Sequence, residues 1–296
     1  MDLDGEILKI LVTGAGGFIG QGVVNELSKQ HEVVALTTGP EHSWMPKCVR
    51  GNFTNPEDLQ KLDDYNIEAA VHLAAVTGGA PEQAAFSVNV LGTRTLLRYL
   101  ANRGCKKIVC ASSIAAIGFQ NTKFRPLAIP IPDEHPCLDR DGYGVSKFLM
   151  EEVTRYIQRS VPDLDIINLR LSSVTPNGSP NPLVRVSPLG MWSLGTITLM
   201  SLRDAVTAFT LAVESNLVPG VRTMNAAGPR AWVNVPVATV LRNWYGADID
   251  VSYFDKKGHE WAGVFDVTKI RNELGFLAQD GPEVYYPESY PGPAGV

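Results

Sequence analysis

Short apolar runs alternate with amphipathic segments through the first half of the chain. Between the first two runs, Ile19, Val23, Val24 and Leu27 repeat at the spacing of a helix that lays one face on a sheet. Strands that alternate with helices form a parallel sheet, because each connection crosses over one of its faces. The pattern therefore predicts a doubly wound α/β fold. The predicted strands lie within residues 7–12, 32–36, 69–75, 106–112 and 165–171.

Two proline-rich segments interrupt this rhythm. Residues 119–142 and 175–190 each contain four prolines, which excludes regular helix and central strand. Loops of this length inside a compact domain are usually functional. After Gly190 the alternation weakens. We predict a sheet domain over residues 1–172 and a smaller mixed α/β region over residues 173–296, with the chain free to cross between the two.

Composition limits the partners and the location. The chain has 296 residues, 45% hydrophobic, and its formal net charge of −5 supplies no basic stripe for nucleic acid. No apolar run approaches the roughly 20 residues that span a membrane, so we predict a cytoplasmic protein with no membrane partner. Cys48, Cys105, Cys110 and Cys137 lack C-x-x-C spacing and a histidine cluster, which argues against a metal site and against disulfides.

The segment TGAGGFIG, residues 13–20, connects the first predicted strand to the first predicted helix. Its glycines fit the pattern G-x-x-G-x-x-G as Gly14, Gly17 and Gly20. A glycine turn before a helix offers free backbone N–H groups to a phosphate and lets the phosphate approach the backbone. A tight turn without a ligand is the alternative. A P-loop is disfavoured, because no Lys-Ser or Lys-Thr pair follows.

The end of the second strand is the expected contact for the adenosine ribose of a dinucleotide. Thr37 occupies this corner, where no carboxylate repels a 2′-phosphate and no arginine attracts one. The sequence of this corner therefore favours NADP over NAD only slightly. Asn52, after the expected third strand, is a candidate for the adenine edge or an ordinary turn residue.

YGVSK places Tyr143 and Lys147 four residues apart, so a helix brings both side chains to one face. An adjacent ammonium group favours the phenolate, which lets a tyrosine act as general acid or base toward a carbonyl or alcohol. The segment ASSIAAIG follows another strand, and a serine at the carboxyl end of a parallel strand points into the crevice where doubly wound proteins bind ligands. An ordinary helix surface pair is the alternative for the tyrosine and lysine.

These motifs in this order resemble the extended short-chain dehydrogenase/reductase family. The resemblance runs along nearly the whole chain and includes VHLAA, NVLGTRTLL, LRLSSVTPNG, MSLRDAVTAFTLAVE and FDVTKIRNELGF. It implies a Rossmann domain that binds NAD(H) or NADP(H), a small C-terminal substrate domain and a homodimer. It also implies that Ser113 is the catalytic serine and Tyr143 the acid/base. Lys147 then tunes Tyr143 and binds the nicotinamide ribose.

The remaining site residues follow from the motifs and the resemblance together. For the cofactor we expect Gly14, Gly17, Phe18, Ile19, Gly20, Thr37, Asn52, Phe53, Leu73, Ala74, Ala75, Asn89 and Lys147. Asn89 also fits a helix-cap or packing residue. For the substrate we expect Thr77, Ser112, Ser173 and Arg185.

The reaction remains open at this point. Ile114 and Ala115 replace the Asp-Glu pair of the family's dehydratases, which disfavours dehydration. Ser173 stands where sugar-nucleotide epimerases commonly have asparagine, and Arg185 is a candidate partner for a substrate carboxylate as well as a plain loop arginine. We favour an NAD(P)-dependent oxidoreductase that acts on a secondary alcohol or ketone of a sugar-like molecule. An epimerase is the alternative, and a dinucleotide-binding regulator without turnover is a further one.

Overall fold

The computed structural model describes residues 7–119, 121–178, 183 and 187–292. The strands are β1 Lys9–Thr13, β2 Glu32–Thr37, β3 Lys47–Arg50, β4 Ala69–His72, β5 Lys107–Ser113, β6 Asp165–Leu171, β7 Ser173–Thr175, β8 Leu199–Ser201 and β9 Gly220–Ala226. The helices are α1 Phe18–Leu27, α2 Pro56–Gln60, η1 Asp63–Tyr65, α3 Glu82–Ala85, η2 Phe86–Gly92, α4 Thr93–Asn102, η3 Ile114–Ile117, α5 Gly142–Ser160, α6 Ser193–Thr196, α7 Leu202–Glu214, α8 Val237–Tyr245, α9 Thr268–Leu274 and α10 Pro282–Tyr285.

The described residues form ten helices, α1 to α10, and three short segments, η1 to η3. Of the short segments, η1 and η3 are 3₁₀ turns and η2 is a π-helix. None of the described helices is long and apolar enough to cross a membrane.

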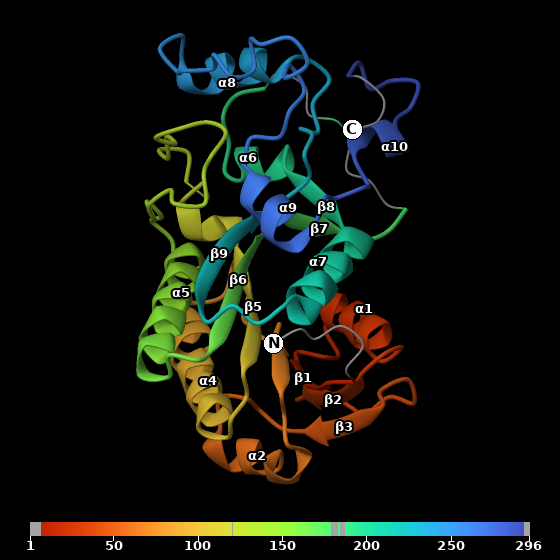
Figure 1. Cartoon of the computed structure of the whole chain (residues 1–296). Coiled ribbons are helices and arrows are strands. Elements are labelled where there is room, and N and C mark those ends of the chain that lie inside the picture. Colours follow the sequence, from red (N-terminus) through yellow and green to blue (C-terminus); the bar gives the residue numbers. More distant parts are fainter. Residues whose placement is uncertain (1–6, 120, 179–182, 184–186, 293–296) are drawn as a thin grey trace.

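Seven strands form one parallel sheet in the order β3-β2-β1-β4-β5-β6-β9 (Figure 1). The order reverses between β1 and β4, because the chain first builds outward to β3 and then returns to the other side of β1. In such sheets the ligand crevice lies at the carboxyl ends of the strands, beside this reversal. The predicted doubly wound fold is confirmed. The sequence analysis expected a strand before Asn52, where β3 lies, but it did not predict β9.

Helices cover both faces of the sheet. Side chains alternate along β1, so Ile10 and Val12 pack into the core cluster beneath α1 and α7, while Leu11 packs into the cluster beneath α4 and α5. Helix α1 carries Val23, Val24 and Leu27 on its buried face, as its periodicity predicts, and it ends at Leu27. Both faces of a parallel sheet are thereby removed from water.

The second half of the chain contributes to two parts of the molecule. A third core cluster includes Phe124, Trp244 and Phe254, and it lies beyond the carboxyl ends of the main strands. β7 and β8 form a separate parallel pair. β9 nevertheless joins the main sheet beside β6, and α7 packs against α1. The chain therefore crosses back into the sheet domain after residue 172.

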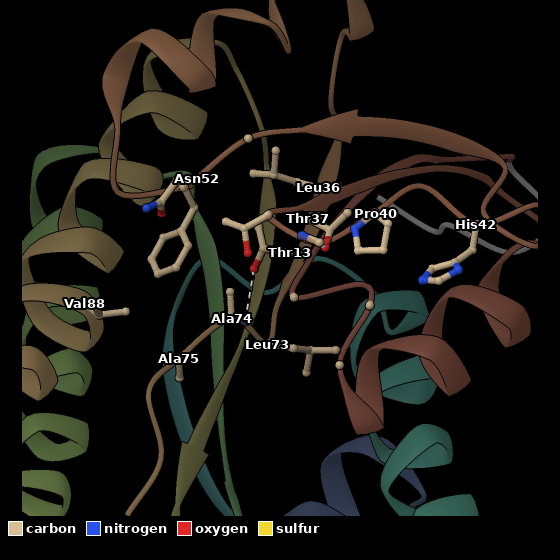
Figure 2. A pocket seen from close by; sticks show the side chains of 17 residues that line it. Thr13, Leu36, Thr37, Pro40, His42, Asn52, Leu73, Ala74, Ala75 and Val88 are labelled. Carbon is tan, nitrogen blue, oxygen red and sulfur yellow. Dashed lines mark hydrogen bonds between the residues drawn. The ribbon is translucent and has the colours of Figure 1, made fainter. Parts of the chain in front are cut away.

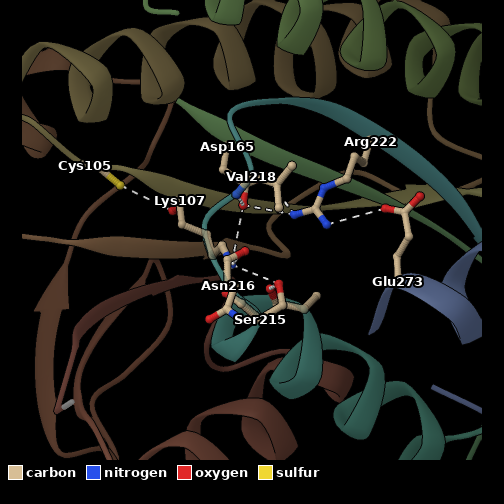
Figure 3. Close-up of polar contacts among 9 residues, drawn as sticks. Cys105, Lys107, Asp165, Ser215, Asn216, Val218, Arg222 and Glu273 are labelled. Carbon is tan, nitrogen blue, oxygen red and sulfur yellow. Dashed lines mark hydrogen bonds and ion pairs between the residues drawn. The ribbon is translucent and has the colours of Figure 1, made fainter. Parts of the chain in front are cut away.

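The amino end of the sheet holds a buried group of charges (Figure 3). Asp165, at the start of β6, lies 3.5 Å from the Lys107 ammonium and accepts two hydrogen bonds from Arg222, at 2.9 and 3.0 Å. Lys107 also donates to the Ser215 hydroxyl, at 2.9 Å. Burial lowers the pKa of Lys107 to about 8, and Asp165 opposes that shift. Arg222 reaches Glu273 of α9 at 3.5 Å, so these charges connect β5, β6 and β9 to α9.

Candidate active site

The glycine-rich turn between β1 and α1 is built as its spacing predicts. Gly14 has a φ of +68°, and a Cβ there would lie 2.7 Å from the backbone nitrogen of Ala74. Only glycine fits both the left-handed backbone and this close approach to the next strand. Gly17 caps α1 without any side-chain hydrogen bond, so the first N–H groups of the helix stay available to an anion. A Cβ on Gly20 would collide with the Gly14 carbonyl, which explains the third glycine.

A cavity of about 490 Å³ opens beside this turn (Figure 2). Its walls come from the carboxyl ends of β1, β2 and β4 and from the turn after β3. Eight of the predicted cofactor residues line it: Gly14, Gly17, Thr37, Asn52, Phe53, Leu73, Ala74 and Ala75. The sequence analysis missed nine others: Thr13, Gly16, Leu36, Thr38, Gly39, Pro40, His42, Gly51 and Val88.

The lining of this cavity suits an anionic group such as a phosphate. Free helix N–H groups border it on one side, and none of its described lining residues is acidic. At the ribose corner, the Thr37 hydroxyl accepts a hydrogen bond from the Gly39 N–H at 3.0 Å and keeps its own proton for a ligand. Asn52 is partly engaged, since its amide oxygen accepts from the Thr54 N–H at 3.0 Å.

The remaining predicted cofactor residues lie around this cavity without lining it. Phe18 is exposed at the start of α1, and Ile19 packs against the core beneath that helix. Asn89 lies in η2, where its amide group bonds both the N–H and the carbonyl of Val76 at 3.0 Å. It also donates to Ser146 at 3.0 Å. The structure therefore gives Asn89 a positioning contact between the loop after β4 and helix α5.

Ser113, Tyr143 and Lys147 come together at the next strand ends. Ser113 closes β5, and its side chain hydrogen-bonds the Tyr143 phenol. Helix α5 begins one residue before Tyr143, because the Asp141 carboxylate caps it by accepting the Tyr143 and Gly144 N–H groups. One turn further, the Lys147 ammonium lies 5.9 Å from the centre of the Tyr143 ring and donates to the Ala111 carbonyl at 2.9 Å.

Burial sets the protonation of this trio. It raises the pKa of the Tyr143 phenol, and the hydrogen bond with Ser113 opposes the shift. It lowers the pKa of Lys147 to about 8, against the attraction of Glu151 one turn along α5. The phenol therefore keeps its proton near neutral pH.

A second cavity, of about 210 Å³, lies in front of this trio. It brings together Ser113 and Tyr143 with the predicted substrate residues Thr77 and Ser173. The sequence analysis did not select its other walls, which come from the loop after β4, the loops after β5 and β6, and the segment before α6. They are Gly78, Ile114, Phe119, Leu171, Ser172 and Trp192.

Two predicted substrate residues are not found at this cavity. Ser112 points away from it and donates to the Glu151 carboxylate at 2.6 Å, because neighbouring residues of a strand face opposite sides. Glu151 in turn pairs with Arg170 of β6, at 2.9 and 2.8 Å, and all three side chains are buried. Ser112 therefore belongs to the support behind the site. Arg185 lies outside the described residues.

Comparisons with known proteins agree with this geometry. Residues 10–186 match the model of the NAD dependent epimerase/dehydratase family. The UDP-glucose 4-epimerase of Pisum sativum is 29% identical over 209 residues, which cover 60% of this chain and 58% of that protein. The chain thus spans little more than half the length of this curated relative.

Two solved structures share the fold across almost the whole chain. A short-chain dehydrogenase/reductase superfamily protein from Agrobacterium tumefaciens, with bound NAD, has a TM-score of 0.72 and 23% identity and covers 95% of this chain and 96% of its own. A mutated uronate dehydrogenase has a TM-score of 0.67 and 20% identity and covers 98% and 88%.

The fold and the site together define a Rossmann protein of the extended short-chain dehydrogenase/reductase class. Its Ser-Tyr-Lys constellation and its glycine turn lie at the same edge of the sheet. Since the family match covers more than half of the chain, the chain belongs to the NAD dependent epimerase/dehydratase family.

Proposed function

We propose that this protein is an NAD(P)-dependent oxidoreductase that acts on a secondary alcohol or ketone of a sugar-like molecule. The observation that carries the proposal is the convergence of Ser113, Tyr143 and Lys147 on the 210 Å³ cavity, beside a larger cavity bordered by a glycine turn. A dinucleotide held by the glycine turn would supply or accept the hydride. The residues of the chain handle the proton and hold the substrate oxygen.

In the reducing direction, the Ser113 hydroxyl holds the carbonyl oxygen and the Tyr143 phenol gives it a proton. The Lys147 cation stabilises the resulting phenolate. Formation of this phenolate costs more free energy than in water, because the Tyr143 ring is largely buried. In the oxidising direction the same phenolate removes the alcohol proton. The Ala111 carbonyl holds Lys147 by one hydrogen bond, and this leaves two ammonium protons for the phenol and a ribose hydroxyl.

The test is a panel assay of the purified protein with NAD and NADP, in both oxidised and reduced forms. The panel contains free sugars, sugar acids and nucleotide sugars. We expect substrate-dependent change in the absorbance of the reduced nicotinamide. If no member of the panel is converted with either dinucleotide, the proposed activity is wrong.

An epimerase is the second candidate, and the 29% identity to a UDP-glucose 4-epimerase favours it. The same proton and hydride transfers would then run forward and back on opposite faces of one carbon. Such an enzyme converts its substrate without net change in nicotinamide absorbance. Chromatography of the sugars in the panel separates the two candidates. Protein purified with dinucleotide already bound would favour the epimerase.

For the cofactor we propose a slight preference for NADP, since Thr37 and Thr38 line the ribose corner and no acidic residue does so among the described lining. Thr37→Asp is expected to raise the KM for NADP about tenfold relative to that for NAD, because a carboxylate repels the 2′-phosphate. An unchanged ratio of the two KM values would contradict the assignment of this corner.

We also propose a homodimer, as the resemblance implies. Leu91 of η2 and Tyr156 of α5 are large exposed side chains on the neighbouring helices. Light scattering measures the mass directly. A monomer at micromolar concentration would exclude a stable dimer.

A further inference from the structure

The last three residues of β5 have three different partners. The Ala111 carbonyl accepts a hydrogen bond from the Lys147 ammonium at 2.9 Å. The Ser113 side chain bonds the Tyr143 phenol. Ser112 lies between these two residues and faces the opposite side of the strand, because side chains alternate along it. The position of this strand end therefore decides how both the ammonium and the phenol are held.

Ser112 is attached to a buried carboxylate. Its hydroxyl donates to Oε1 of Glu151 at 2.6 Å, a short distance that is typical of a hydroxyl bonded to an ionised acceptor. Glu151 lies on α5, one turn after Lys147 and two turns after Tyr143. Both Ser112 and Glu151 are buried. One hydrogen bond thus connects α5 to the end of the strand that holds the two reactive side chains of this helix.

The carboxylate keeps its charged partner without Ser112. Arg170 of β6 donates to Glu151 through Nε at 2.9 Å and through Nη2 at 2.8 Å, and its Nη1 donates to the Asp133 carbonyl at 2.7 Å. Ser112 and Arg170 are direct neighbours in the register of β5 and β6. Removal of the Ser112 hydroxyl leaves the Glu151–Arg170 pair intact, so its cost in stability should be small.

We propose that Ser112 is a positioning residue for proton transfer. Its hydrogen bond to Glu151 fixes the end of β5, and the fixed strand end holds Lys147 and Tyr143 in place. The inference deepens the proposed function and rests on it for the roles of Tyr143 and Lys147. It gives the two adjacent serines different tasks: Ser113 contacts the phenol, and Ser112 acts only through the strand.

The amino end of the same strand supplies a matched control. Lys107 begins β5, and its ammonium donates to the Ser215 hydroxyl at 2.9 Å. Burial lowers the pKa of Lys107 and the pKa of Lys147 to about 8. Ser112→Ala and Ser215→Ala each remove one serine hydroxyl that is bonded to a buried ionised side chain. The two variants act at opposite ends of β5, so only Ser112→Ala should affect Lys147.

The first measurement is the titration of the two lysines by NMR of protein that carries ¹³C-labelled lysine. It needs neither substrate nor dinucleotide, and Lys147→Arg assigns the Lys147 signal. In Ser112→Ala the strand end is held less firmly, so the ammonium form of Lys147 loses stabilisation and its pKa should fall by about half a unit. Ser215→Ala should lower the pKa of Lys107 instead. Both variants keep the other titratable side chains near Lys147, which are Tyr143, Cys110, Glu151 and His72.

The second measurement is kinetic and uses a substrate found in the panel. Ser112→Ala should lower kcat about tenfold with little change in KM, because proton transfer is less well aligned while the substrate keeps its contacts. The alkaline limb of the kcat profile should move to lower pH together with the pKa of Lys147. Ser112→Thr keeps a hydroxyl and should restore both properties. Urea unfolding of Ser112→Ala and Ser215→Ala should give similar, small losses of stability.

These measurements distinguish failure of the inference from failure of the proposed function. If the pKa of Lys147 falls in Ser112→Ala but the wild-type protein converts no member of the panel, the proposed function is wrong and the positioning of Lys147 by Ser112 holds. If the panel yields a substrate but Ser112→Ala leaves kcat or the pKa of Lys147 unchanged, the inference is wrong and the proposed function holds. Equal effects of Ser112→Ala and Ser215→Ala on Lys147 also overturn the inference, because they would reflect a general loosening of the strand.

Discussion

The two ends of the parallel sheet differ in whether their buried polar side chains have partners within the protein. At the amino end, Lys107, Asp165 and Arg222 carry full charges, and each reaches an oppositely charged side chain of the group (Figure 3). At the carboxyl end, the cavity in front of Tyr143 is lined by uncharged hydroxyls, and that of Ser172 has no partner. One end is closed by its own side chains, and the other is open to a ligand.

This difference separates stability from activity. Charges buried against one another contribute to the folded state only as a set, because removal of one leaves the others without compensation. Unpaired hydroxyls and bare N–H groups lower stability slightly and gain their partners when a ligand binds. Substitutions at the amino end should therefore change unfolding, and substitutions at the carboxyl end should change binding and turnover.

Tyr143→Phe is expected to have the largest effect. Loss of the phenol removes the acid/base, so kcat should fall about a thousandfold, within the range of general acid–base catalysis. Steady-state kinetics measure it, and the unfolding midpoint and the dinucleotide Kd serve as controls that should change little. Near-normal turnover would show that another group exchanges the proton.

Asp165→Asn is the counterpart at the amino end. The substitution leaves the buried Lys107 and Arg222 without their carboxylate, and the free energy of unfolding should fall by about 3 kcal/mol. Urea unfolding measures this, and kcat of the protein that remains folded should stay close to that of the wild type. Glu32→Gln, which breaks an exposed pair with Lys47, is the matched control with no measurable loss. A large loss of kcat in Asp165→Asn would show that the amino end of the sheet also contributes to activity.

Gly14→Ala tests the backbone of the dinucleotide cavity. The new Cβ would press on the Ala74 backbone and move the turn, so the Kd for the dinucleotide should rise about a hundredfold, equivalent to roughly 2.7 kcal/mol. Gly104→Ala is the control, because Gly104 also has a positive φ, of +83°, but nothing lies near its Cβ position. Similar Kd values for the two variants would mean that the turn does not hold the diphosphate.

The smallest expected effect concerns pH. His72 is buried between the Thr13 and Thr93 hydroxyls, at 2.7 and 2.9 Å, and burial lowers its pKa to about 3 from an ordinary 6.5. Between these values the unfolded chain binds a proton that the folded protein does not, so stability falls as the pH falls from 6.5 toward 3. Asp133, whose pKa burial raises to about 6 from 3.8, acts in the opposite sense between those two values.

His72→Gln should remove the first contribution. Between pH 6.5 and 4.5 this variant should lose about 2 kcal/mol less unfolding free energy than the wild type. Urea unfolding at several pH values gives both slopes. Parallel slopes would show that His72 takes up its proton in the folded state.

Much of this arrangement could be predicted from short-range patterns. The glycine spacing gave the turn at Gly14, and the four-residue spacing of Tyr143 and Lys147 gave their common helix face, because both depend on local geometry. The roles of the adjacent serines were harder to predict. Neighbours in a strand face opposite sides, so only one of Ser112 and Ser113 can reach the cavity, and the chain uses the other to hold Glu151.

The walls of the cavity could not be predicted in this way. Phe119 and Trp192 lie in or beside proline-rich loops and are far apart in the sequence, so no periodicity connects them. The sequence predicted that these loops are functional, but the contact between the two rings depends on the tertiary structure that brings Phe119 and Trp192 together. The hydrogen-bond partner of Asn89 could not be predicted either, because it is the backbone of Val76, which has no sequence signature.

The Asn89 contacts also bear on how substrate and product exchange. Asn89 holds Val76 on one side and Ser146 on the other, and Ser146 donates to the Tyr143 carbonyl at 2.7 Å. The wall at Thr77 and the wall at Tyr143 are thereby fixed to each other. Trp192 lies on a separate segment of the chain. We therefore expect substrate and product to enter and leave the cavity on the side of Trp192. The rate of product release should then depend on how readily the indole ring moves.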